Sequence, residues 1–109
     1  MNESEFNQRG DELMLAVEEA IDACGVDIDY ETSAGVMTLT MEADGSKVII
    51  SRQPAMLQIW LAAKSGGYHF ALQNGVWVCT TTAETFRDLL SRVCTELAGE
   101  FVALDFDDE

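Results

Sequence analysis

Hydrophobic residues recur with a helical period over residues 4–24. The apolar members of this stretch fall on one stripe and are Phe6, Leu13, Val17, Ala20, Ile21 and Cys24. The acidic members on the opposite arc are Asp11, Glu12, Glu18, Glu19 and Asp22. Gly25 follows as a natural stop. The pattern predicts a first helix with an apolar back and an acidic front.

Between positions 26 and 79 the period changes to two, and turn residues recur at short intervals. The alternating runs are VDIDYE, VMTLTM, KVIISR, LQIWLAA, YHFAL and VWVC. In the first run the apolar side chains face one way, and Asp27, Asp29 and Glu31 face the other. Asp-Gly at 44–45 and Asn-Gly at 74–75 indicate hairpin turns, and Pro54 limits the third run. The pattern predicts a meander of about six short antiparallel strands.

A second helical stripe follows the meander and consists of Phe86, Leu89, Leu90, Val93, Cys94 and Leu97. Thr81 is expected to open this element, because Glu84 three positions later completes a capping box. Gly99 marks its expected end.

The tail after this stripe, EFVALDFDDE, is partly apolar. Phe101, Val102 and Leu104 are expected to pack back onto the domain, whereas the acidic last residues are expected to fray. The order helix, six strands, helix predicts an α+β fold, a two-layer α/β sandwich of order αββββββα. Both helices would cover one face of the antiparallel sheet and leave the other face open. Residues 1–109 are expected to form a single domain.

The charge balance narrows the classes of partner. Twenty Asp and Glu residues oppose six Lys and Arg residues, which gives a formal net charge of −14. Phosphates of nucleic acids and anionic membranes repel such a chain, so metal cations and basic proteins are the expected partners. No apolar run approaches the ~20 residues that span a bilayer. The start, MNESEF, lacks the features of a signal peptide, so a cytoplasmic location is expected.

The sequence offers little for catalysis. No Gly-rich phosphate loop or nucleophile elbow occurs, so we do not expect an enzyme. His69 is the only histidine, and it alternates with Tyr68 and Phe70, which places it on the open face of the sheet. Gln58 and Trp60 share that face, where an exposed tryptophan would serve as an anchor for protein contact. The opposite arrangement would put three aliphatic side chains in water.

Three cysteines, Cys24, Cys79 and Cys94, are too few and too widely spaced for a disulfide framework or a structural zinc site. They are expected to be reduced and mostly buried.

The acidic arc of the first helix and the acidic edge at 27–31 are adjacent in the chain, so they could merge into one ridge. Carboxylates about 6 Å apart repel by roughly 3 kcal/mol at an effective dielectric of 20. Two interpretations of this crowding stay open on the residues alone. The carboxylates form either a solvated surface or an oxygen-only site for hard cations and basic partners.

One segment resembles a known family. SRQPAMLQIWLAAKSGGYHF, at 51–70, closely resembles the signature region of the frataxins, and NESEF and ETFRDLL resemble the bacterial CyaY branch. The similarity covers essentially the whole chain. It implies a monomeric iron-binding accessory protein of iron–sulfur cluster assembly, with a two-layer α/β sandwich fold. Such a protein would bind Fe(II) and Fe(III) weakly, would accept other divalent or trivalent cations, and would modulate the cysteine desulfurase and its scaffold protein.

The resemblance also assigns residues to two surfaces. The acidic ridge would consist of Glu12, Glu18, Glu19, Asp22, Asp27, Asp29 and Glu31, with Asp11 beside them. The partner-binding sheet patch would consist of Gln53, Gln58 and Trp60, with His69 nearby.

The chain departs from its relatives at three places. It has ACG at 23–25 in place of a denser acidic run, Asn7 in place of a histidine, and Ser51 in place of an asparagine. Two alternatives stay open. One is an iron-oxidising or iron-storing protein that oligomerises with excess iron, and the other is an acidic interaction module that works without metal.

Overall fold

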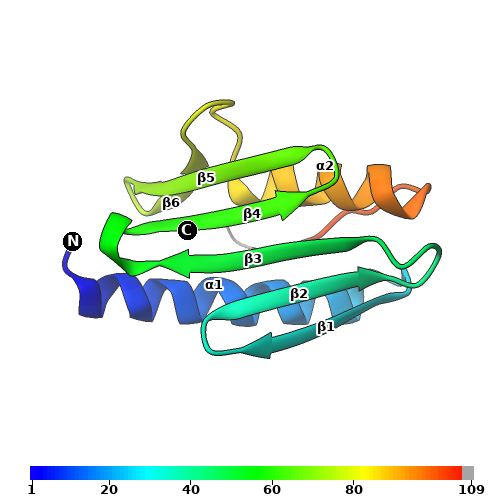
Figure 1. The fold of residues 1–109 in the computed structure, drawn as a ribbon, viewed down its shortest axis with the longest axis horizontal. Coiled ribbons are helices and arrows are strands. Elements are labelled where there is room, and N and C mark those ends of the chain that lie inside the picture. Colours follow the sequence, from blue (N-terminus) through cyan, green and yellow to red (C-terminus); the bar gives the residue numbers. More distant parts are fainter. Residues whose placement is uncertain (107–109) are drawn as a thin grey trace.

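The computed structural model describes residues 1–106 and shows two helices packed on one face of a six-stranded antiparallel sheet (Figure 1). The elements are α1 Glu3–Ala23, β1 Ile28–Ser33, β2 Val36–Met41, β3 Lys47–Gln53, the 3-10 helix η1 Pro54–Met56, β4 Gln58–Ala63, β5 Gly66–Gln73, β6 Val76–Cys79 and α2 Phe86–Ala98. Strands follow one another across the sheet in chain order, from β1 to β6. The predicted sandwich and its order are therefore confirmed. The predicted fraying concerns positions 107–109, which lie outside the described residues.

The hairpin turns follow from local backbone preferences. Asn74 and Gly75 both have positive φ, 52° and 83°, which is the geometry of a tight two-residue hairpin loop. Pro54 ends β3 as predicted, because it cannot donate to the ladder. The chain then continues into η1, and Leu57 adopts a left-handed conformation at its end. As a result β4 begins at Gln58, one residue after the start of the predicted run.

The core lies between the helices and the sheet. The apolar stripes predicted for both helices point into it, and Phe6, Phe70 and Phe86 are each at most 1% exposed. Phe70 and Phe86 meet edge to face with ring centroids 4.8 Å apart, which joins the sheet to α2. This packing leaves the opposite face of the sheet uncovered (Figure 1).

Arg52 is a cation in the layer between α1 and the sheet. Its side chain is 16% exposed, and its guanidinium binds the Asp11 carboxylate and the Asn7 carbonyl. A Cβ atom at Gly10 would lie 3.1 Å from Nε of Arg52. Gly10 therefore has a packing role in the middle of the helix, where glycine otherwise costs about 1 kcal/mol relative to alanine.

The start of α2 differs from the prediction. Thr85 caps this helix, and its hydroxyl accepts a hydrogen bond from the amide of Asp88 at 3.2 Å. Thr81 lies in the preceding loop, so the predicted capping box at 81–84 is wrong. The Glu84 carboxylate is instead bonded by Arg92 from within α2, at 2.8 and 3.0 Å. That ion pair holds the loop against the helix and moves the helix start to Phe86.

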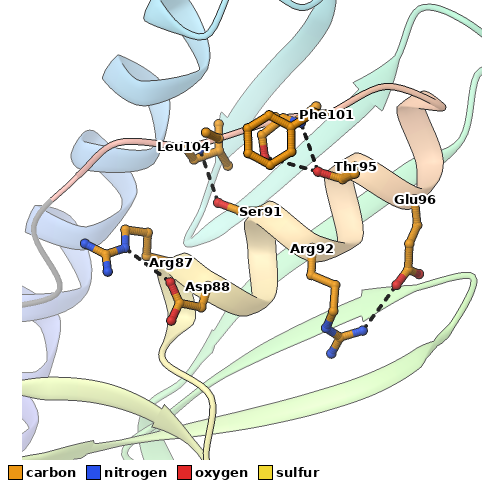
Figure 2. A pocket seen from close by; sticks show the side chains of 10 residues that line it. Arg87, Asp88, Ser91, Arg92, Thr95, Glu96, Phe101 and Leu104 are labelled. Atoms are coloured by element: carbon orange, nitrogen blue, oxygen red, sulfur yellow. Dashed lines mark hydrogen bonds and ion pairs between the residues drawn. The ribbon is translucent and has the colours of Figure 1, made fainter.

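The tail packs against α2, although not through every predicted residue (Figure 2). Val102 and Leu104 are 1% and 3% exposed, as predicted, whereas Phe101 is 81% exposed and points away from the core. The Thr95 hydroxyl accepts from the Val102 amide at 2.9 Å and donates to its carbonyl at 3.1 Å. Ser91 accepts from the Leu104 amide at 3.2 Å. An extended tail alternates sides, so burying residues 102 and 104 forces residue 101 outward.

Candidate functional site

Two carboxylates of α1 are tied to the neighbouring strand β1. The Tyr30 hydroxyl donates to the Asp22 carboxylate at 3.0 Å, and the Thr32 hydroxyl donates to Glu18 at 2.7 Å. The hydrogen bond to Asp22 raises the pKa of Tyr30, because ionisation would remove the donor and add a charge beside the carboxylate. The helix and strand predicted to merge into a ridge are therefore in direct contact.

The acidic side chains of β1 project from the face of the strand that points away from α1. Asp29 and Glu31 alternate with Tyr30 and Thr32, so they face the open side of the sheet while the hydroxyls face α1. The predicted ridge is thus two rows of carboxylates separated by the width of one strand. Asp27 is exposed just before the strand begins.

A depression of about 500 Å³ lies on the open face beside the second row. It is lined by Asp29, Tyr30, Glu31, Thr38, Thr40 and Lys47. Lys47 stands across the sheet from Asp29, with Thr40 between them in the register, and its ammonium donates to the Thr40 hydroxyl at 3.2 Å. One cation of the protein therefore already lies beside the acidic edge.

Glu42 joins the ridge and was missed by the sequence analysis. A hydrogen bond with Asp29 raises the pKa of Glu42, and the negative charge of the Asp29 carboxylate acts in the same direction. The Glu42 amide also donates to the Asp27 carbonyl at 3.2 Å, which places the first residue after β2 beside the residue before β1. The Ala34-Gly35 turn between β1 and β2, with an antiparallel register, could have located it, because residue 42 then faces residue 27.

The remaining ridge residues are spread along α1. Asp11 is committed to Arg52, and it lies seven residues, or about 10 Å, before Glu18 on the helix axis. Glu12 is exposed beside Arg9 and Met1 near the start of the helix. Glu19 is exposed in the same half of α1 as Glu18. The structure therefore brings together the acids around β1 and leaves the first two apart.

These carboxylates suit weak binding of hard cations. Within residues 1–106, no three His, Cys, Asp or Glu side chains lie close enough together to hold a metal ion as they stand. The donors are oxygens on exposed side chains, which hard cations prefer and soft metals do not. A cation would have to draw side chains together and would share them with water, which lowers its affinity.

The four residues of the sheet patch lie together on the open face. Trp60 stacks on His69, with ring centroids 4.3 Å apart and planes 10° from parallel. Its indole N–H donates to Gln58 at 2.9 Å, and Gln53 is the cross-strand neighbour of Gln58. Trp60 is on the predicted face, but His69 covers one side of its ring, so it is half-buried rather than fully exposed. The stack forms one aromatic unit on the open face.

A small hollow of about 140 Å³ adjoins this stack. Ile49, Ala62 and Gly67 form its base beside Trp60 and His69. The space beside Gly67 is open, because a Cβ atom built there would have no other atom within 4 Å. A larger hollow of about 520 Å³ lies between α2 and the tail (Figure 2).

The cysteines match the sequence expectation. Cys79 and Cys94 are buried, Cys24 is half-buried, and all three are free thiols. Burial raises the pKa of Cys94 to about 12. Burial acts in the same direction on Cys79, but hydrogen bonds from Thr81 and Thr82 outweigh it and lower its pKa to about 7.

Neither helix is long and apolar enough to cross a membrane, as judged over positions 1–106.

Comparison with known proteins gives consistent matches. The frataxin-like domain family matches residues 1–100. A frataxin from Psychromonas ingrahamii is 35% identical with a TM-score of 0.89, and the match covers 97% of this chain and 100% of that one. A trimeric frataxin from the yeast Saccharomyces cerevisiae, complexed with ferrous iron, is 36% identical with a TM-score of 0.67 over 88% of this chain and 87% of its own. The same yeast protein with its full-length N-terminus is 37% identical, with a TM-score of 0.64 over 83% and 75%.

Proposed function

Because this chain belongs to the frataxin-like family, we propose that it is an iron-binding accessory protein of iron–sulfur cluster assembly. It binds Fe(II) and Fe(III) weakly on the acidic ridge and modulates the cysteine desulfurase and scaffold complex through protein contacts. The observation that carries the proposal is the junction of α1 with β1, where Tyr30 and Thr32 hold Asp22 and Glu18 beside a second row of carboxylates. The yeast frataxin complexed with ferrous iron supports it.

Iron is cargo in this proposal. Exposed oxygen ligands would hold it no more tightly than about 10⁻⁵ M, which is the weak limit of preformed carboxylate sites that sense calcium. Weak binding suits delivery or sensing, because the ion must leave again. Other divalent and trivalent hard cations should compete for the same carboxylates.

Anaerobic titration with ferrous iron, followed by NMR, tests the metal arm. Shifts and broadening should gather on residues 18–31 and on Glu42. Asp29→Asn should weaken binding, whereas Glu5→Gln, which removes the same charge about 25 Å along α1 from Asp22, should not. Equal effects of the two variants would show that only the net charge attracts the ion.

Binding to the desulfurase and scaffold tests the partner arm. Trp60→Ala should weaken complex formation, because it removes half of the aromatic stack with His69. Neutralising Asp27, Asp29 and Glu31 distinguishes the metal-independent interaction module from a metal-dependent role. If docking depends on charge, these changes should abolish binding to the desulfurase even in the absence of metal. Oxygen consumption with ferrous iron, together with metal-dependent oligomers, would favour the iron-oxidising alternative instead.

A further inference from the structure

The strand β1 forms one edge of the sheet, with β2 on its inner side (Figure 1). The hydrogen bond from the Glu42 amide to the Asp27 carbonyl makes residues 27 and 42 a hydrogen-bonded pair. Such pairs alternate along an antiparallel ladder, so the residues of β1 that bond β2 are Asp29, Glu31 and Ser33. The residues between them must direct their backbone groups the other way.

The outward backbone groups belong to Ile28, Tyr30 and Thr32. Within residues 1–106, no backbone amide or carbonyl pairs with them on that side. The opposite edge of the sheet differs, because Val78 of β6 is bridged by Thr85. Among the described strands, β1 is therefore the one whose outer edge offers a row of free donors and acceptors.

Carboxylates flank this free edge on both faces of the sheet. Asp29 and Glu31 stand on the open face, while Glu18 and Asp22 stand on the helix face, where the hydroxyls of β1 hold them. Proteins often protect a free edge with charge. Here the protection is anionic on both sides, so a second copy of this chain, itself at −14, is repelled. A basic segment is attracted.

We infer that the outer edge of β1 accepts an extended basic segment of a partner protein as an additional strand. Successive side chains of a strand point to opposite faces, so consecutive arginines or lysines would meet the two rows of carboxylates in turn. Backbone hydrogen bonds would set the register, and the charges would select the partner. The inference rests on the proposed function for the identity of the partner and adds the way in which it binds.

A proline at position 32 tests the backbone contribution. Thr32→Pro removes an outward amide and leaves the ladder to β2 intact, because that amide does not bond β2. Thr32→Val is the matched control, since it also loses the hydroxyl bonded to Glu18 but keeps the amide. We expect Thr32→Pro to bind the desulfurase about tenfold more weakly than Thr32→Val, equivalent to about 1.4 kcal/mol. NMR spectra of both variants show whether each is folded.

Hydrogen exchange on the wild-type protein gives a second measurement that needs no variant. The probe is a six-residue peptide with threonine at each end and alternating arginine and lysine between, capped at both termini. Binding should slow exchange at the amides of Ile28, Tyr30 and Thr32, while those of Asp29 and Glu31, already paired with β2, should change little. A control peptide of the same sequence, N-methylated at alternate residues, keeps the charge and should bind more weakly.

The outcomes separate this inference from the proposed function. Equal binding by Thr32→Pro and Thr32→Val, with no protection of the outward amides, would overturn the inference while leaving charge-based docking and iron binding in place. A wild-type protein that binds neither the desulfurase nor the peptide would remove both the inference and the partner arm of the proposed function. Slower exchange confined to the outward amides of β1, together with weaker desulfurase binding by Thr32→Pro than by Thr32→Val, supports the added strand.

Discussion

Replacing Leu104 with alanine should lower the free energy of unfolding by about 2–3 kcal/mol. Leu104 belongs to the tail that packs against α2 and is 3% exposed, and buried Leu→Ala changes cost roughly 2–5 kcal/mol. The lower part of that range applies because the tail can shift to fill part of the space. Domains of this size have about 5–15 kcal/mol of stability, so the variant should still fold. Its midpoint in urea should fall by about 1 M.

The hydrogen bonds from α2 add a second, coupled contribution. Thr95→Val removes both bonds to Val102 and leaves the Val102 amide and carbonyl without partners, which should cost about 1–3 kcal/mol. The tail is either docked or released, so the double variant Thr95→Val/Leu104→Ala should lose less than the sum of the single losses. A double-mutant cycle in urea, monitored by circular dichroism, measures this coupling.

Phe101→Ala is the matched control for the tail. Phe101 is 81% exposed, so its removal should change the stability by less than about 0.5 kcal/mol, although the side chain is larger than that of Leu104. If Leu104→Ala costs no more than Phe101→Ala, the tail is not held against α2 and the reasoning fails.

Three further predictions concern charge. Glu42→Gln should raise the melting temperature at pH 7, because the hydrogen bond with Asp29 and the charge of Asp29 both raise the pKa of Glu42 and so disfavour its ionised form in the folded protein. Protonation of Glu42 in the wild-type protein removes the same penalty, so the advantage of the variant should vanish as the pH falls below 4.5, the ordinary pKa of the group. A series of melts at different pH values checks this. Arg52→Ala should cost about 1.5–3 kcal/mol in urea denaturation, since it removes charged hydrogen bonds to Asp11 and to the backbone of α1. A divalent cation at 100 times its dissociation constant should add about 2.7 kcal/mol to the unfolding free energy, and unchanged melting in both millimolar metal and raised salt would refute a strained ridge.

Much of the fold could be predicted because its signals are local. The apolar stripes and the alternating runs each follow from the geometry of a single element, and the Asn74–Gly75 turn needs only its own two residues. The start of α2 could not be predicted in this way. Thr81 and Thr85 both suit a capping position, and the choice depends on Arg92 reaching back to Glu84. Likewise, the outward turn of Phe101 follows from tertiary bonds made by its neighbours.

The candidate site was predictable in composition but not in arrangement. Period-two alternation placed Asp29 and Glu31 on one side of β1, and the helical period placed Glu18 on the front of α1. Neither pattern could show that a strand separates the two rows, because the angle between a helix and a sheet is set by core packing. Glu42 was overlooked because its place beside Asp29 depends on the register of β1 against β2.

The burial of two thiols gives this protein a convenient chemical handle. Cys79 and Cys94 are covered by the core, whereas Cys24 caps the end of α1 and is partly open to solvent. A maleimide dye or spin label added to the folded protein should therefore react first at Cys24, without any engineered substitution. The label would stand a few residues from both Asp22 and β1. Paramagnetic quenching or a fluorescence change at that single position could then report the arrival of a cation or a basic peptide at the ridge.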